Sequence, residues 1–296
     1  MNSKALLWAV LFGFVFVLSG AEARAAQDPG KIIARGVKGK VTAREKAADP
    51  SVNPVTVTNN LELRQGMIIT TEVNASVVLV FTNGTVVNLG TDSVLDIDTF
   101  TMEPGAGDIT PDTIVNEPTV SKTKINLTKG ELVGKVAKLN KAGGSEFTVQ
   151  TPVGAAGIRG TTFRIVYRPG GTGQAFFSLT TIEGSVDVTL AGQVTPSAAV
   201  GANQEVVLAN VTVNVDNVTG QVTITMPAGT STAVQQATAA ATLQVLAIVQ
   251  TMSEATSNIS ISTNGPIIVL ETPPAKKDPV PDATPAKKTT TSADGL

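Results

Sequence analysis

One stretch, residues 147–166, constrains the fold more than any other part of this sequence. It reads FTVQTPVGAAGIRGTTFRIV and carries three closely spaced glycines, Gly154, Gly157 and Gly160, with Arg159 beside the last of them. Glycines in such a pattern indicate a backbone with positive φ, or one that another segment approaches closely. Because β-rich patterns flank the glycines on both sides, we predict two strands joined by a tight crossing inside a sheet core.

Short β-rich runs separated by turn residues extend over residues 55–226. The clearest pair flanks Asn83-Gly84, which favours a type I′ hairpin because both central residues of that turn adopt positive φ. Weaker strand patterns precede this region at residues 31–34 and 40–43. The pattern predicts an all-β fold, either a compact multi-stranded sandwich or roll or a short twisted β-solenoid, together with one C-terminal helix.

An alanine-rich segment, residues 231–254, breaks the strand pattern. Ser231 and Thr232 are suitable N-caps, and apolar residues recur at helical spacings of three and four. The segment has no charged residue before Glu254. We expect its apolar stripe to pack on the protein's own sheet, with an oligomer contact as the alternative. Residues 267–270 predict a last strand.

These patterns divide the chain into five segments. They are a signal peptide at 1–25, a polar N-terminal segment at 26–54, the all-β domain at 55–228, the helix and final strand at 229–270, and a disordered tail rich in proline, lysine and threonine at 271–296.

The N-terminus has the features of an export signal. Lys4 precedes an uninterrupted apolar run at 5–18, which is shorter than the roughly 20 residues of a membrane-spanning helix. The small residues that follow fit cleavage after Ala25, with Ala23 as the alternative. No later stretch is long and apolar enough to span a membrane. We therefore predict a periplasmic or secreted protein whose mature chain has no membrane span.

The composition excludes several kinds of chemistry. The chain has no histidine and no cysteine, so it has no imidazole base, no histidine or thiolate metal ligand and no disulfide. Its net charge of −2 does not indicate a nucleic-acid partner. Aromatic residues make up 4% of the chain, too few for the walls of a carboxylate-dependent glycan hydrolase.

Three carboxylates cluster in one strand pattern. Asp96 and Asp98 share a face of that strand, and Asp92 lies just before it. The turn glycine and loop geometry of a calcium site are missing, so we expect a solvated strand face. We predict no catalytic residue, no cofactor and no metal, and thus a protein that is not an enzyme.

Arg159 is the residue whose position most needs a structural reason. It lies between Ile158 and Gly160 in a strand-dense region, so we expect it to be partly buried. A buried guanidinium needs several acceptors, either loop carbonyls or a carboxylate. We predict that Arg159 orders the crossing rather than binding a ligand, and that Arg159→Ala lowers the melting temperature markedly.

The glycine-rich stretch resembles the core motif of the FecR domain family. The residues that carry the resemblance are Thr151, Pro152, Gly154, Gly157, Arg159, Gly160 and Thr161. Weaker similarities at residues 81–89, 130–132 and 182–188 follow in the expected order. The resemblance extends over roughly residues 55–190, so the all-β domain at 55–228 is similar to a FecR domain.

The resemblance implies an exported all-β module that senses or binds another protein. In the namesake regulators, this module follows an inner-membrane helix and relays the state of an outer-membrane transporter to a cytoplasmic sigma factor. The present sequence shows no cytoplasmic anti-sigma segment and no membrane helix in the mature chain, so iron-transport signalling does not carry over. We predict an exported binding or scaffolding protein of the cell envelope, with another envelope protein or a second copy as its partner. The alternative is a self-associating structural component of the envelope or surface matrix.

Overall fold

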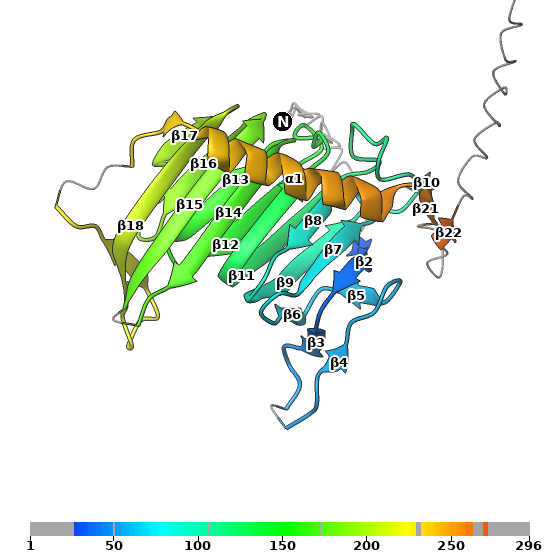
Figure 1. The fold of residues 1–296 in the computed structure, drawn as a ribbon, viewed down its shortest axis with the longest axis horizontal. Coiled ribbons are helices and arrows are strands. Elements are labelled where there is room, and N and C mark those ends of the chain that lie inside the picture. The colour runs from blue at the N-terminus through cyan, green and yellow to red at the C-terminus, as the bar shows by residue number, and fades with distance from the viewer. Residues whose placement is uncertain are drawn as a thin grey trace, which may run out of the picture.

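The computed structural model describes residues 27–49, 51–105, 107–171, 173–228, 232–262 and 269–271. In this part of the chain, two β-sheets pack face to face over a hydrophobic core, and one helix crosses the outer face of one sheet (Figure 1). The predicted all-β fold with a C-terminal helix is confirmed. Of the architectures left open, the sandwich is the one that the two packed sheets form.

The first sheet, sheet A, has alternating inward residues, as in β16, where Val186, Val188 and Leu190 are buried. Neighbouring strands are antiparallel, except that β11 and β12 are parallel. In spatial order its strands are β4 (Val55–Thr56), β3 (Val41–Glu45), β6 (Met67–Thr71), β9 (Ser93–Met102), β11 (Ser121–Lys135), β12 (Glu146–Thr151), β13 (Gly154–Ile158), β16 (Ser185–Leu190) and β17 (Ala198–Gly201), and β1 (Asp28–Pro29) pairs with the end of β9.

The second sheet, sheet B, is antiparallel at every pairing in the described residues. In spatial order its strands are β5 (Glu62–Arg64), β2 (Lys31–Lys38), β7 (Ser76–Phe81), β8 (Val86–Leu89), β11, β14 (Thr162–Pro169), β15 (Gln174–Glu183) and β18 (Gln204–Val215), with β19 (Val222–Thr225) and β20 (Gln235–Gln236) both paired to β18.

Strand β11 belongs to both sheets. Residues 121–129 pair with β9 in sheet A, whereas residues 130–135 pair with β8 and β14 in sheet B. Gly130 marks the change of sheet, with a φ of +102° that disfavours other residues. A Cβ atom at Gly130 would lie 2.0 Å from the Oγ of Ser93, so a side chain at this position does not fit.

The core between the sheets is built from aliphatic residues and a few phenylalanines. The Phe81 ring lies edge-on to Phe100, at a centroid distance of 5.0 Å, and edge-on to Phe147 at 6.4 Å. Each such pair adds about 0.5–1.5 kcal/mol to the gain from burial. The chain has no cysteine, so the packed core, rather than disulfide bonds, holds the sheets together.

Helix α1 (Ala239–Thr256) lies across the outer face of sheet B (Figure 1). Val245 and Met252 belong to a second hydrophobic cluster with residues of β7, β8 and β11. Beyond the helix, β10 (Asp108–Ile109), β21 (Ile259–Ser262) and β22 (Val269–Glu271) form a small separate sheet. The helix therefore packs on its own sheet, although only with part of its apolar surface.

Two local predictions are wrong in detail. The helix begins after Thr238, whose Oγ1 accepts a hydrogen bond from the Ala241 amide at 3.1 Å, rather than at Thr232; Ser231 lies outside the described residues. The loop at Asn83-Gly84 is not a type I′ turn, because Gly84 has a φ of +85° and Asn83 does not have a positive φ. The Gly84 amide instead donates to the Phe81 carbonyl, which gives a three-residue loop that ends at glycine.

The N-terminal segment that was predicted to be polar, residues 26–54, contributes strands to both sheets of the sandwich. Both weak strand patterns form strands, β2 and β3, and β2 pairs with both β5 and β7 in sheet B. No helix in the described ranges is long and apolar enough to cross a membrane. The predicted signal peptide at 1–25 and nearly all of the predicted tail at 271–296 lie outside the described residues.

Candidate functional site

The glycine-rich motif spans three strands rather than the two predicted. It comprises β12, a turn at Pro152-Val153, β13, and a crossing at residues 159–161 that carries the chain from sheet A into β14 of sheet B. The Thr151 hydroxyl donates to the Gly154 carbonyl at 3.1 Å and accepts from the Val153 amide at 3.3 Å, which holds the turn. The motif therefore links the two layers of the sandwich.

The three motif glycines have different environments. A Cβ at Gly154 would lie 2.3 Å from the Thr189 carbonyl oxygen, on the backbone of the neighbouring β16. Gly160 has a φ of +64°, and a Cβ there would lie 3.0 Å from the Cα of Lys138. Gly157 has neither constraint, since the nearest atom to its Cβ would be 3.8 Å away. Close approach or positive φ therefore explains two of the glycines and not the third.

Arg159 is exposed, which contradicts the expected burial. Its side chain is 60% exposed and forms an ion pair with Asp187 of β16. The acceptor is thus a carboxylate, one of the two alternatives expected. The buried arginine of this region is Arg164 on β14, whose Nε donates to Glu131 Oε1 at 2.7 Å while both side chains are largely covered.

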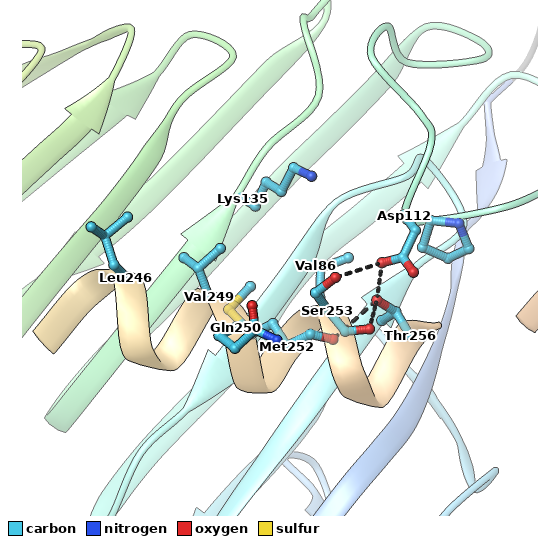
Figure 2. A pocket seen from close by; sticks show the side chains of 10 residues that line it. Val86, Asp112, Lys135, Leu246, Val249, Gln250, Met252, Ser253 and Thr256 are labelled. Carbon is cyan, nitrogen blue, oxygen red and sulfur yellow. Dashed lines mark hydrogen bonds between the residues drawn. The ribbon is translucent and has the colours of Figure 1, made fainter. Parts of the chain in front are cut away.

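A groove lies on sheet B between helix α1 and the loop at residues 110–115, and we call it the helix groove (Figure 2). It consists of two adjoining hollows of about 360 and 230 Å³ that share Pro111, Asp112 and Lys135. The larger hollow is lined by Val86, Leu246, Val249, Gln250, Met252, Ser253 and Thr256. The smaller hollow is lined by residues that include Ile114, Lys138, Glu183 and the end of the glycine-rich motif, Gly160 and Thr161.

Polar groups stand at the edges of this mainly apolar groove. Asp112 accepts hydrogen bonds from Thr256 Oγ1 at 2.7 Å and from Ser253 Oγ at 3.5 Å, which ties the loop to the end of α1 (Figure 2). Lys135 and Lys138 form no ion pair with any described residue. An unpaired ammonium beside apolar surface is suited to contact an incoming carboxylate or carbonyl.

The three clustered aspartates are engaged by cations. Asp96 and Asp98 do share a face, because Lys46 lies 2.7 Å from Asp96 and 3.6 Å from Asp98, and Lys124 contacts Asp98 at 3.2 Å. The hydrogen bond and negative charge of Asp96 raise the pKa of Lys46. In the described ranges, no group of three or more acidic side chains could hold a metal ion.

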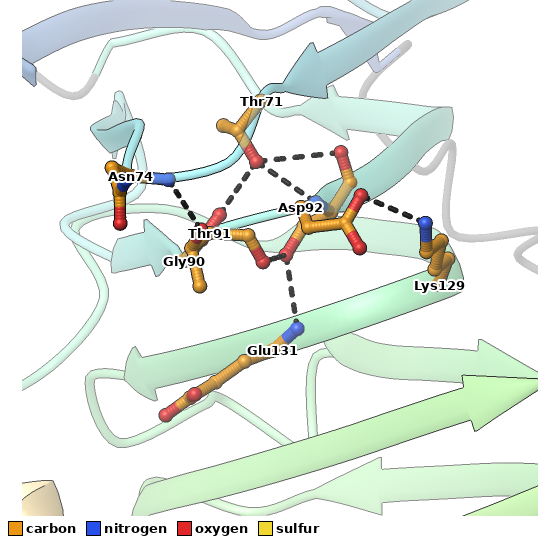
Figure 3. A network of polar contacts seen from close by, with 8 residues as sticks. Thr71, Asn74, Gly90, Thr91, Asp92, Lys129 and Glu131 are labelled. Carbon is orange, nitrogen blue, oxygen red and sulfur yellow. Dashed lines mark hydrogen bonds and ion pairs between the residues drawn. The ribbon is translucent and has the colours of Figure 1, made fainter. Parts of the chain in front are cut away.

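Asp92 lies elsewhere, beside the turn that precedes β9. Its Oδ1 lies 2.7 Å from Lys129 Nζ, and Figure 3 shows this contact next to the hydrogen bonds that hold the turn. The Thr71 hydroxyl donates to the Gly90 carbonyl and accepts from the Ser93 amide, and the Ser93 hydroxyl accepts from the Glu131 amide at 3.0 Å. These bonds hold β6, β9 and β11 together where β11 passes from sheet A to sheet B, so the network has a structural role.

Sequence comparison identifies the central part of the chain. The model of a family described as FecR protein matches residues 67–187. These residues form a FecR domain. The predicted resemblance is therefore confirmed over this range, which contains the complete glycine-rich motif and Lys135 of the helix groove.

Among solved structures, the chain is similar to candidate anti-sigma factors from Parabacteroides distasonis. One, at 1.65 Å resolution, is 15% identical with a TM-score of 0.36, and the match covers 54% of this chain and 59% of that chain. Another, at 2.50 Å, is 12% identical with a TM-score of 0.34, and covers 70% and 99% respectively. No curated protein matches the sequence significantly. Similarity at this level does not extend to function.

Proposed function

We propose that this protein is an exported, non-enzymatic FecR-domain protein of the cell envelope that acts by binding another protein. The FecR domain supports a sensing or regulatory role in the envelope. The N-terminal sequence pattern supports export to the periplasm or beyond, with residues 1–25 as the signal peptide. The motif residues from Thr151 to Thr161 act as structural links between the layers rather than as catalytic groups.

The observation that carries this proposal is the helix groove. Its two hollows adjoin each other between α1 and the loop at 110–115, so together they suit an extended chain segment better than one compact small molecule. The apolar lining, with Val86, Val249 and Met252, suits one or two aliphatic side chains of such a segment. Lys135 and Lys138 on the β11 side suit an acidic residue beside them.

The FecR motif reaches this groove at its last residues. Gly160 and Thr161 line the smaller hollow, and the positive φ of Gly160 turns the chain there without a side chain in the space beside Lys138. The same residues that connect the sheets therefore also shape one end of the proposed binding surface.

Site-specific photo-crosslinking in the native organism tests the proposal. A photoreactive phenylalanine derivative at Thr113, an exposed groove residue, is expected to capture a discrete partner protein. The same probe at Lys122, an exposed residue of β11 on sheet A, is the matched control and is expected to give no such adduct. Equal products from both positions, or no adduct from Thr113 while the protein is present and folded, would contradict the proposal.

A further inference from the structure

The outward side of helix α1 has an unusual composition for a surface helix. Ala240, Leu243, Ala247 and Gln250 are all exposed, and at 100° per residue they lie opposite the buried Val245 and Met252. Leu243 is 66% exposed. Residues 239–253 contain no charged side chain, whereas the solvent side of a surface helix is normally polar or charged.

Large and small side chains alternate along this outward side in a symmetrical way. Leu243 and Ala247 lie equally far before and after Val245, and so do Ala240 and Gln250. If a second helix ran antiparallel with a two-fold axis at the height of Val245, each Leu243 would face an Ala247. Each Gln250 would likewise face an Ala240. The surface thus presents a large residue to a small one at both positions, as close helix packing requires.

The lack of charge favours a copy of the same chain over a different partner. In a two-fold interface each surface meets itself, so charges near the axis meet like charges. Here Glu254 is the only charged residue of the helix, and antiparallel pairing would place the two Glu254 residues about 27 Å apart. Antiparallel helix dipoles also attract each other. A partner of opposite charge would find only Glu254, at the C-terminal end of this face, to match.

We propose that two copies of this protein associate through the outward side of α1, with the helices antiparallel and Leu243 of each copy against Ala247 of the other. Leu243, Ala240 and Ala247 do not line the helix groove, whereas Gln250 does, so the dimer and the groove partner use surfaces that meet only at Gln250. The contact area of one helix lies at the low end for specific interfaces, so we expect a weak dimer whose population depends on concentration.

Sedimentation velocity of the mature chain over a wide concentration range tests the association. We expect a monomer–dimer equilibrium that Leu243→Glu abolishes, because it places two carboxylates in the interface. Val194→Glu is the matched control, since Val194 is 99% exposed and lies in a loop between β16 and β17, and it is expected to leave the equilibrium unchanged. A protein that stays monomeric at every concentration, or a Leu243→Glu variant that still dimerises, would overturn the proposal.

Crosslinking tests the antiparallel arrangement. The chain has no cysteine, so Leu243→Cys and Ala247→Cys variants each carry one thiol. A short bismaleimide is expected to link a mixture of the two variants faster than it links either variant alone. Equal rates in all three samples would contradict the proposed pairing. Lys135 lines the helix groove and lies outside the outward side of α1. Lys135→Glu is therefore expected to leave dimerisation unchanged while it impairs binding of the groove partner, which distinguishes the two proposals.

Discussion

Alanine substitution at Gly154, Gly157 and Gly160 is expected to change the free energy of unfolding in three different ways, although all three glycines belong to one motif. At Gly154, a Cβ would lie 2.3 Å from the Thr189 carbonyl oxygen and 2.9 Å from the Leu190 Cα. Both atoms are backbone of β16, which cannot move without disturbing its pairing with β13. We therefore expect Gly154→Ala to cost about 3 kcal/mol, at the upper end for overpacking.

The other two positions should behave differently. Gly160→Ala places an alanine at a φ of +64°, which costs about 1–2 kcal/mol. Gly157 is in an extended strand with free space around its Cα, so alanine there only reduces the freedom of the unfolded chain. We expect Gly157→Ala to stabilise the protein by about 0.5 kcal/mol.

Urea unfolding followed by far-ultraviolet circular dichroism measures all three. The only tryptophan, Trp8, lies in the predicted signal peptide, so tryptophan fluorescence of the mature chain is not available as a probe. Unchanged m-values would show that the midpoint shifts report stability. Equal losses for Gly157→Ala and Gly154→Ala would refute the reasoning, because the two residues differ in the space around them and not in their strand.

Two further predictions concern charged and titratable side chains. Arg159→Ala is expected to lower the free energy of unfolding by about 1 kcal/mol or less, because its ion pair is exposed. This value replaces the marked loss expected from the sequence. Arg164→Ala should lower it by about 3 kcal/mol, because it leaves Glu131 covered and unpaired. The same urea assay compares the two variants. A larger loss of stability for Arg159→Ala than for Arg164→Ala would contradict the conclusion that Arg164 forms the more stabilising ion pair. Burial raises the pKa of Tyr167 above 10.0, so the folded state holds this proton more tightly and stability falls as the pH rises above about 10. Tyr167→Phe should remove that part of the alkaline loss in pH-dependent urea titrations, and identical alkaline slopes would show that Tyr167 does not contribute.

Many strands of the sandwich could be predicted from the sequence, because alternating apolar residues mark them locally, but the spacing did not distinguish a sandwich from a roll or a solenoid. The hairpin at Asn83-Gly84 and the turn at residues 218–220 lie where the turn residues indicate. The turn type at Asn83 could not be predicted, since Asn-Gly also fits the three-residue loop in which only the glycine has positive φ. The start of the helix was ambiguous because several threonines and serines before Ala239 are suitable caps.

The orientation of Arg159 and the helix groove could not be predicted because both depend on contacts between distant segments. Arg159 follows the buried Ile158, and its outward direction is set by Asp187 on a strand that is adjacent only in the folded sheet. The groove combines the loop at 110–115, the end of β11 and helix α1. Its lysines resemble any solvated lysine in the sequence, so no local signal marks Lys135.

The central claim is that the helix groove binds a partner protein through Lys135 and the apolar residues beside it. The most direct measurement is the yield of the adduct captured by a photoreactive residue at Thr113, compared between Lys135→Glu and Lys122→Glu variants. Both substitutions reverse one exposed charge on β11, but only Lys135 lines the groove. We predict that Lys135→Glu removes the adduct and that Lys122→Glu leaves it unchanged. Equal yields from the two variants would contradict the claim.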